Sequence, residues 1–171
     1  LNSPIIKKMI NKNKPIRIAI AGLGFGESVH IPASLSNENI ELAGLWHPKL
    51  ERLNEVCNKY NLYAYKNWED LLNDPQIEGI IIATPPAPRY ELALEAIKAG
   101  KHLLLEKPTC LNFHEVMELQ RNALTRNLKI AVDYEYRAVP LFMQAKRIIN
   151  EKELYEPYFV KLDWLMSSRA N

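Results

Sequence analysis

The chain has 171 residues, of which 47% are hydrophobic and 25% are charged, a profile typical of a soluble globular protein with one domain and part of a second. Six glycines and eleven prolines exclude a collagen-like chain, and a net charge of +2 argues against a dedicated nucleic-acid-binding protein. No apolar run reaches the roughly 20 residues that cross a bilayer, so we expect no membrane partner. Two cysteines, Cys57 and Cys110, argue against a disulfide framework and favour a cytoplasmic location.

The first 14 residues carry four lysines and no acidic residue. They lack the continuous apolar core of a signal peptide. We therefore expect residues 1–14 to form a solvated basic arm that directs no export.

From residue 15, short apolar segments rich in β-branched residues alternate with segments whose apolar residues recur at helical spacing. Strands are expected over residues 16–21, 40–46, 63–65, 79–83, 102–105 and 128–132. Helices are expected over residues 28–36, 49–60, 68–72, 89–99 and 112–127. This alternation predicts an α/β fold, a doubly wound parallel Rossmann sheet with helices on both faces.

The pattern changes after Asp133. A helix is expected over residues 140–150 and a strand over residues 158–165. A single strand cannot pair its backbone groups or bury its apolar side chains by itself. We therefore expect the start of a second, α+β domain that continues beyond Asn171.

A glycine-rich turn at residues 22–26 follows the first strand. Glycines at this position permit a tight bend and let backbone amides approach a pyrophosphate at a helix N-terminus, although a plain glycine-rich turn would look the same. The residues assigned to cofactor binding in this turn are Gly22, Gly24, Phe25 and Gly26. Glu27 stands where the usual spacing has Gly or Ala, and its carboxylate would repel a pyrophosphate unless it points into solvent.

The end of the second strand bears on the choice of cofactor. NAD-binding proteins place an acidic residue about 20 positions after the glycines, where it accepts hydrogen bonds from the adenosine ribose. Residues 46–49 read Trp-His-Pro-Lys, and no carboxylate precedes Glu51. His47 and Lys49 are candidates to face a 2′-phosphate, which favours NADP over NAD, unless both are plain loop residues.

Two short motifs follow later strands. Thr84-Pro85 comes after the fourth strand, and Glu106-Lys107-Pro108 comes after the fifth. Ligands of open parallel sheets bind outside the carboxyl ends of the strands. Thr84 and Pro85 are therefore candidates to flank a nicotinamide, although a proline that only ends the strand would give the same pattern.

In this order and placement, the glycine turn, the Thr-Pro and the Glu-Lys-Pro motifs resemble the Gfo/Idh/MocA oxidoreductases. The Ala-Gly-Lys-His segment at residues 99–102 and Tyr136-Arg137 followed by Pro140 add to this resemblance, which covers about residues 16–165. It implies an NAD(P)-dependent enzyme that transfers a hydride between the nicotinamide and a secondary alcohol or ketone of a sugar, sugar nucleotide or cyclitol. Arg89 departs from the family pattern, because many members have His there.

The resemblance also implies roles for individual residues. Lys107 matches the lysine that contacts the nicotinamide end and the substrate hydroxyl, and its ammonium group would polarise the reacting C–O bond as a catalytic residue. Glu106 would orient the cofactor ribose and Lys107. The family's usual catalytic Asp and His would lie beyond Asn171, so this chain alone is expected to be inactive.

The same resemblance implies how the chain is divided. A dinucleotide-binding domain is expected over residues 15–133, and the first part of a substrate and oligomerisation domain over residues 134–171. The full-length protein is expected to form a homo-oligomer and to act on a small molecule, most simply a carbohydrate.

Two other classes of protein stay open. The chain would be a non-catalytic nucleotide-binding or interaction module if it bound a nucleotide or partner without turnover, with residues 158–165 as an exposed pairing edge. A methyltransferase ranks third, because its glycine turn follows an acidic residue whereas this strand ends Ala-Ile-Ala. The histidines at 30, 102 and 114 suggest no pairing with a second ligand, and we predict no metal site.

Overall fold

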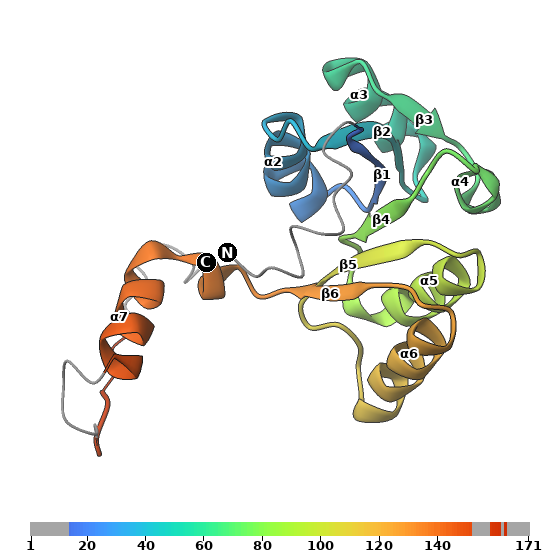
Figure 1. The fold of residues 1–171 in the computed structure, drawn as a ribbon. Helices are drawn as coiled ribbons and strands as arrows, with labels where there is room; N and C mark the ends of the chain where they lie inside the picture. Colours follow the sequence, from blue (N-terminus) through green and yellow to red (C-terminus); the bar gives the residue numbers. More distant parts are fainter. Residues whose placement is uncertain (1–13, 152–157, 162, 164–171) are drawn as a thin grey trace. The chain divides into compact units, whose positions relative to one another are not determined.

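The computed structural model describes residues 14–151, 158–161 and 163 (Figure 1). The chain divides into two compact units, Leu1–Asp133 and Tyr134–Asn171. Within the described ranges of the second unit, a 3₁₀ turn (Glu135–Ala138) precedes the helix α7 (Pro140–Asn150). No helix in the part of the chain that the structure describes is both long and apolar enough to cross a bilayer.

The first unit is built on a parallel sheet with the strand order β3-β2-β1-β4-β5-β6. Its strands are β1 (Ile16–Ala21), β2 (Ile40–Trp46), β3 (Tyr63–Tyr65), β4 (Gly79–Ile82), β5 (His102–Glu106) and β6 (Ile130–Asp133). After β3 the chain crosses to the other side of β1, so the strand order reverses between β1 and β4, as Figure 1 shows. This is the doubly wound Rossmann topology, and the predicted fold class is confirmed.

Helices cover both faces of this sheet. They are η1 (Gly26–His30), α2 (Ile31–Leu35), α3 (Leu50–Tyr60), α4 (Trp68–Asn73), α5 (Pro86–Lys98) and α6 (Phe113–Thr125). Successive residues of β4 point to opposite faces, so Ile80 and Ile82 pack with α5 and α6, whereas Ile81 joins the core beneath α3. Burying each such isoleucine contributes about 2 kcal/mol.

Two helices begin earlier than the sequence pattern predicts. The helix after β1 begins at Gly26 with a wide π-helical turn, in which the Ile31 N–H bonds to the Gly26 carbonyl. Pro32 follows in the first turn of α2, where its missing N–H is tolerated. Helix α5 begins at Pro86. Proline fits this position because the N–H groups of the first turn have no hydrogen-bond partner within a helix.

The predicted strand at residues 158–165 is not found where the structure describes the chain. Residues 158–161 and 163 have no regular structure, and the rest of the segment lies outside the described residues. Tyr158 and Val160 are exposed. The prediction was wrong there because apolar alternation supplies a strand only when a neighbouring strand pairs with its backbone.

Candidate functional site

The loops after β1, β2, β4 and β5 border one cavity of about 570 Å³ at the carboxyl edge of the sheet. Of the nine residues that the sequence assigned to cofactor binding, eight line it: Gly22, Gly24, Phe25, His47, Thr84, Pro85, Glu106 and Lys107. Gly26 is not among the lining residues. It is buried, and a Cβ there would lie 3.1 Å from the Ile20 side chain, so its role is close packing of helix on strand.

The glycine turn combines a crowded position with an open one. Gly22 has φ +95°, and a Cβ there would lie 2.7 Å from the backbone of Ala83 and Thr84. Only glycine fits this conformation without strain. A Cβ on Gly24, by contrast, would meet no atom within 4 Å, so its missing side chain leaves room for a ligand against the backbone. The turn fits a pyrophosphate in the way that glycine turns of this fold do.

Glu27 does not present a bare carboxylate to this turn. Its side chain pairs with Arg52 and, at 2.9 Å, with Lys59, both on α3. The hydrogen bond from Lys59 and the charge of Arg52 lower the pKa of the Glu27 carboxyl. The departure from the glycine spacing is therefore compensated by two cations, which removes the repulsion that the sequence suggested.

The end of β2 brings one of its two basic candidates to the cavity. His47 lines the cavity, and its Nδ1 accepts a hydrogen bond from the Lys49 backbone N–H at 3.1 Å. The Lys49 side chain is exposed and is not among the lining residues. The preference for NADP over NAD thus depends on His47 and stays a prediction.

Thr84 carries a buried hydroxyl at the cavity wall. The residue is 5% exposed, and its Oγ1 has no hydrogen-bond partner among the described residues. An unpaired buried hydroxyl costs about 1–3 kcal/mol. Thr84 contributes to the site through its place in the cavity lining, where it lies with the open glycine turn around the space that a dinucleotide takes in this fold.

Arg89 is a cavity residue whose structural role the sequence did not reveal. It is 3% exposed, and its guanidinium donates hydrogen bonds to the backbone oxygens of Thr84, Glu106 and Pro108. Burial lowers the pKa of Arg89, and the nearby Glu106 carboxylate acts against that effect. Arg89 therefore ties the loop after β4 to the loop after β5. The one available signal was an arginine in the first turns of a helix that is otherwise largely apolar.

Lys107 lies at the same wall. Its Nζ is 5.9 Å from the centre of the Phe25 ring, within the range of a cation–π interaction. Its backbone N–H donates to Glu106 Oε2 at 3.1 Å. The end of β5 and the residue that follows it therefore place a carboxylate and an ammonium group in the lining of one cavity.

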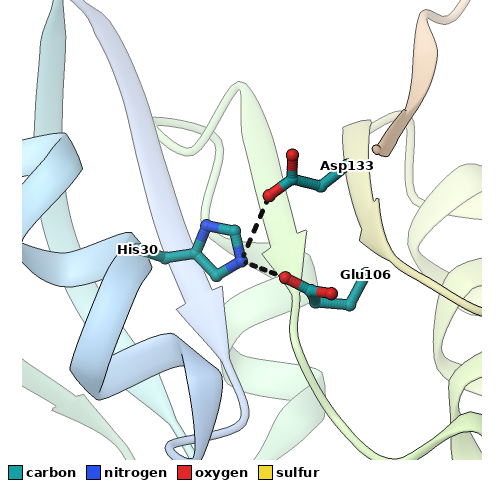
Figure 2. A group of neighbouring side chains, drawn as sticks. All are labelled: His30, Glu106 and Asp133. Carbon is teal, nitrogen blue, oxygen red and sulfur yellow. Dashed lines mark hydrogen bonds and ion pairs between the residues drawn. The ribbon is translucent and has the colours of Figure 1, made fainter. Parts of the chain in front are cut away.

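His30 does have a second ligand-type partner, contrary to the sequence prediction. Its Nε2 is 2.9 Å from Glu106 Oε1 and 3.9 Å from Asp133 Oδ2, as Figure 2 shows. The three ligand atoms lie within 4.8 Å of one another, a grouping that could hold a metal ion, whereas the sequence predicted none. The prediction that His30 lacks such a partner was wrong because the fold brings these residues together, and His30 and Glu106 are 76 positions apart. The prediction of no metal site stays a prediction.

Comparison with known proteins agrees with this geometry. A family model described as "Oxidoreductase family, NAD-binding Rossmann fold" matches residues 16–134. An uncharacterised oxidoreductase of Synechocystis sp., sll0816, is 37% identical over 163 residues, which are 95% of this chain and 44% of that protein. The scyllo-inositol 2-dehydrogenase (NADP(+)) IolW of Bacillus subtilis is 29% identical over 141 residues, 81% of this chain and 38% of that protein.

Among solved structures, an NAD-binding protein from Listeria innocua superposes with a TM-score of 0.75 at 27% identity. That match covers 81% of this chain and 41% of the other. The chain thus spans well under half the length of the proteins that it matches. With a family model over most of its length and the Rossmann site in place, the chain belongs to the Gfo/Idh/MocA family of oxidoreductases.

Proposed function

We propose that this chain is the cofactor-binding part of an NAD(P)-dependent dehydrogenase or reductase that acts on a secondary alcohol or ketone of a sugar, sugar nucleotide or cyclitol. The observation that carries the proposal is the cavity at the reversal of strand order, lined by eight residues that the sequence had singled out. In open parallel sheets this is the position of a dinucleotide.

Each part of the cavity has a task in this proposal. The backbone of the turn at residues 22–26 receives the pyrophosphate at the start of a helix. His47 faces the adenosine end, where its ring favours a 2′-phosphate and hence NADP. Thr84 and Pro85, which line the cavity after β4, flank the nicotinamide.

The nicotinamide, when bound, supplies the hydride chemistry. Lys107 is the proposed catalytic residue of this chain, because its ammonium group at the cavity wall can donate a hydrogen bond to the oxygen of the reacting C–O group. Glu106 holds the backbone of Lys107 through its Oε2. The loop after β5 thereby sets the position of the donor.

The substrate class is supported by relatives rather than by the cavity. Two relatives that are 25% and 29% identical to the chain carry the names of inositol dehydrogenases. A polyhydroxylated ring offers the secondary hydroxyl that this chemistry requires. We extend the proposal to a whole protein that is homo-oligomeric and cytoplasmic. The two buried free cysteines agree with the cytoplasmic location.

The test is a fluorescence titration of the chain with NADPH and, separately, with NADH. We expect saturable binding that is tighter for NADPH, and weakened about tenfold by Lys107→Ala, the loss of one charge-assisted contact. Lys129→Ala is the matched control, since this exposed lysine precedes β6 at the opposite edge of the sheet.

Two other results of these binding and activity measurements would contradict parts of the proposal. Absence of binding by a chain whose circular dichroism shows it folded would overturn the proposed cofactor site. Binding by the chain, together with no oxidation of any cyclitol or sugar by the whole protein in the presence of NADP⁺ or NAD⁺, would favour the non-catalytic module.

A further inference from the structure

We propose that His30 is a positioning residue of the cofactor site, which holds the Glu106 carboxylate and thereby sets the nicotinamide end of the cavity. The inference rests on the proposed function, because it assigns a role within that same site. It concerns a residue that does not itself line the cavity.

Both oxygens of the Glu106 carboxylate have a hydrogen-bond partner within the protein. Its Oε1 bonds to His30 Nε2 at 2.9 Å, and its Oε2 accepts the Lys107 backbone N–H at 3.1 Å. The side chains of His30 and Glu106 are 6% and 7% exposed. One carboxylate oxygen is thus fixed by the imidazole, which Figure 2 shows, and the other by the backbone of the residue proposed for catalysis. The low exposure of both side chains leaves water little access to the first of these bonds.

The hydrogen bond between His30 and Glu106 connects two elements that are far apart in the sequence. His30 ends the helical turn that begins at Gly26 after β1, whereas Glu106 ends β5. The dinucleotide fold consists of two mononucleotide-binding halves, one on each side of the strand reversal. The His30–Glu106 bond joins the helix that receives the pyrophosphate to the loop that meets the nicotinamide, so it fixes the two halves of the site relative to each other.

Phe25 connects the same groups by a second route. Its ring meets the His30 ring edge-on at 6.4 Å, and Lys107 Nζ lies 5.9 Å from its centre. The imidazole therefore contacts one neighbour of Lys107 and bonds to another. Loss of the imidazole would release both the carboxylate and the ring.

A metal ion is the competing occupant of the group formed by His30, Glu106 and Asp133. The 2.9 Å separation of His30 Nε2 and Glu106 Oε1 is that of a direct hydrogen bond. Lys107 follows Glu106 directly in the chain, and its positive charge disfavours a metal cation bound to the Glu106 carboxylate. These observations favour the positioning role, and the experiment below measures metal binding as well.

The test uses two ligands that share the adenosine end but differ in the nicotinamide end. The chain and its variants are titrated with NADPH and with adenosine 2′,5′-bisphosphate, which lacks both the nicotinamide and its ribose. We expect His30→Ala to weaken NADPH binding about tenfold, the effect of losing one hydrogen bond to a charged group, and to leave adenosine 2′,5′-bisphosphate binding within about twofold of the original. His30→Gln, whose amide N–H can replace the imidazole donor, should restore most of the NADPH affinity.

The outcomes separate this inference from the proposed function. If the unchanged chain binds neither ligand, the cofactor site itself is wrong. If it binds both and His30→Ala alters neither affinity, or weakens both equally with a lower melting temperature, the positioning role is overturned. Stoichiometric binding of Zn²⁺ or Mn²⁺ that His30→Ala abolishes would also overturn it, by assigning the group to a metal ion.

Discussion

The two halves of the sheet meet the cavity with different chemistry. The half formed by β1–β3 offers a glycine turn and the loop at His47, so its contribution is mainly backbone and open space. The half formed by β4–β6 offers Thr84, Arg89 and Glu106, which are 5%, 3% and 6% exposed. One half is shaped by the absence of side chains and the other by buried polar groups.

This difference predicts which substitutions disturb the structure or the binding site in each half of the sheet. The first half is most sensitive to the addition of atoms at the glycine turn. The second half is most sensitive to the loss of a polar group, because hydrogen bonds hold the buried Arg89 and Glu106, and a lost partner costs free energy. Adding a methyl group and removing a hydrogen-bond donor are therefore the two informative perturbations.

The largest effect is expected for Gly22→Ala. A Cβ there would lie 2.7 Å from backbone atoms of Ala83 and Thr84 at φ +95°, so we expect a loss of about 4 kcal/mol in the free energy of unfolding, measured by urea denaturation. Gly100→Ala is the matched control: Gly100 has φ +80° but no atom within 4 Å of the added Cβ. It should lose only about 1 kcal/mol. Equal losses would show that the turn is not crowded.

The next largest effect is expected for Arg89→Met. The change leaves the backbone oxygens of Thr84, Glu106 and Pro108 without their donor, and we expect a loss of about 3 kcal/mol in the free energy of unfolding. Arg121→Met, at an exposed position of α6, should change stability by less than about 0.5 kcal/mol. If the two variants melt alike, the buried arginine does not hold the second half together.

The sequence was informative wherever the pattern is local. Apolar runs fixed the six strands to within about two residues, and the parallel order made it possible to predict that Gly24, Thr84 and Lys107 would meet at one edge. The partner of His30 and the three acceptors of Arg89 could not be predicted, because they depend on how helices settle on the sheet. At residues 158–161 and 163, the described part of the strand expected over 158–165, the prediction was wrong because a strand depends on a neighbouring strand.

A smaller effect, on binding rather than folding, is expected for Gly24→Ala. The added Cβ meets no protein atom within 4 Å, so the chain should fold normally, and the methyl group would occupy the space proposed for the pyrophosphate. We expect NADPH to bind at least about tenfold more weakly, or about 1.4 kcal/mol, in a fluorescence titration. Unchanged affinity would place the pyrophosphate elsewhere and would leave the first half without a defined task.

The smallest effect is expected at a contact that links the two halves. The Tyr65 hydroxyl, on β3, donates a 2.6 Å hydrogen bond to Asp74 in the connection to β4. This bond and the Gln76 backbone N–H lower the pKa of Asp74 below its usual 3.8. Tyr65→Phe should lose about 1 kcal/mol in the free energy of unfolding at neutral pH.

The pH dependence of the stability lost in Tyr65→Phe tests whether the ionised Asp74 carboxylate is responsible for it. Because the Asp74 pKa is lower in the folded state, the stabilisation is fully present above 3.8 and is lost as the pH falls through the folded-state pKa. The gap between the original chain and Tyr65→Phe should therefore narrow in urea denaturation below pH 3.8. Tyr63→Phe, on the same strand and 65% exposed, should show little loss at any pH. A gap for Tyr65→Phe that is constant with pH would mean that the hydroxyl stabilises the fold without the negative charge of Asp74.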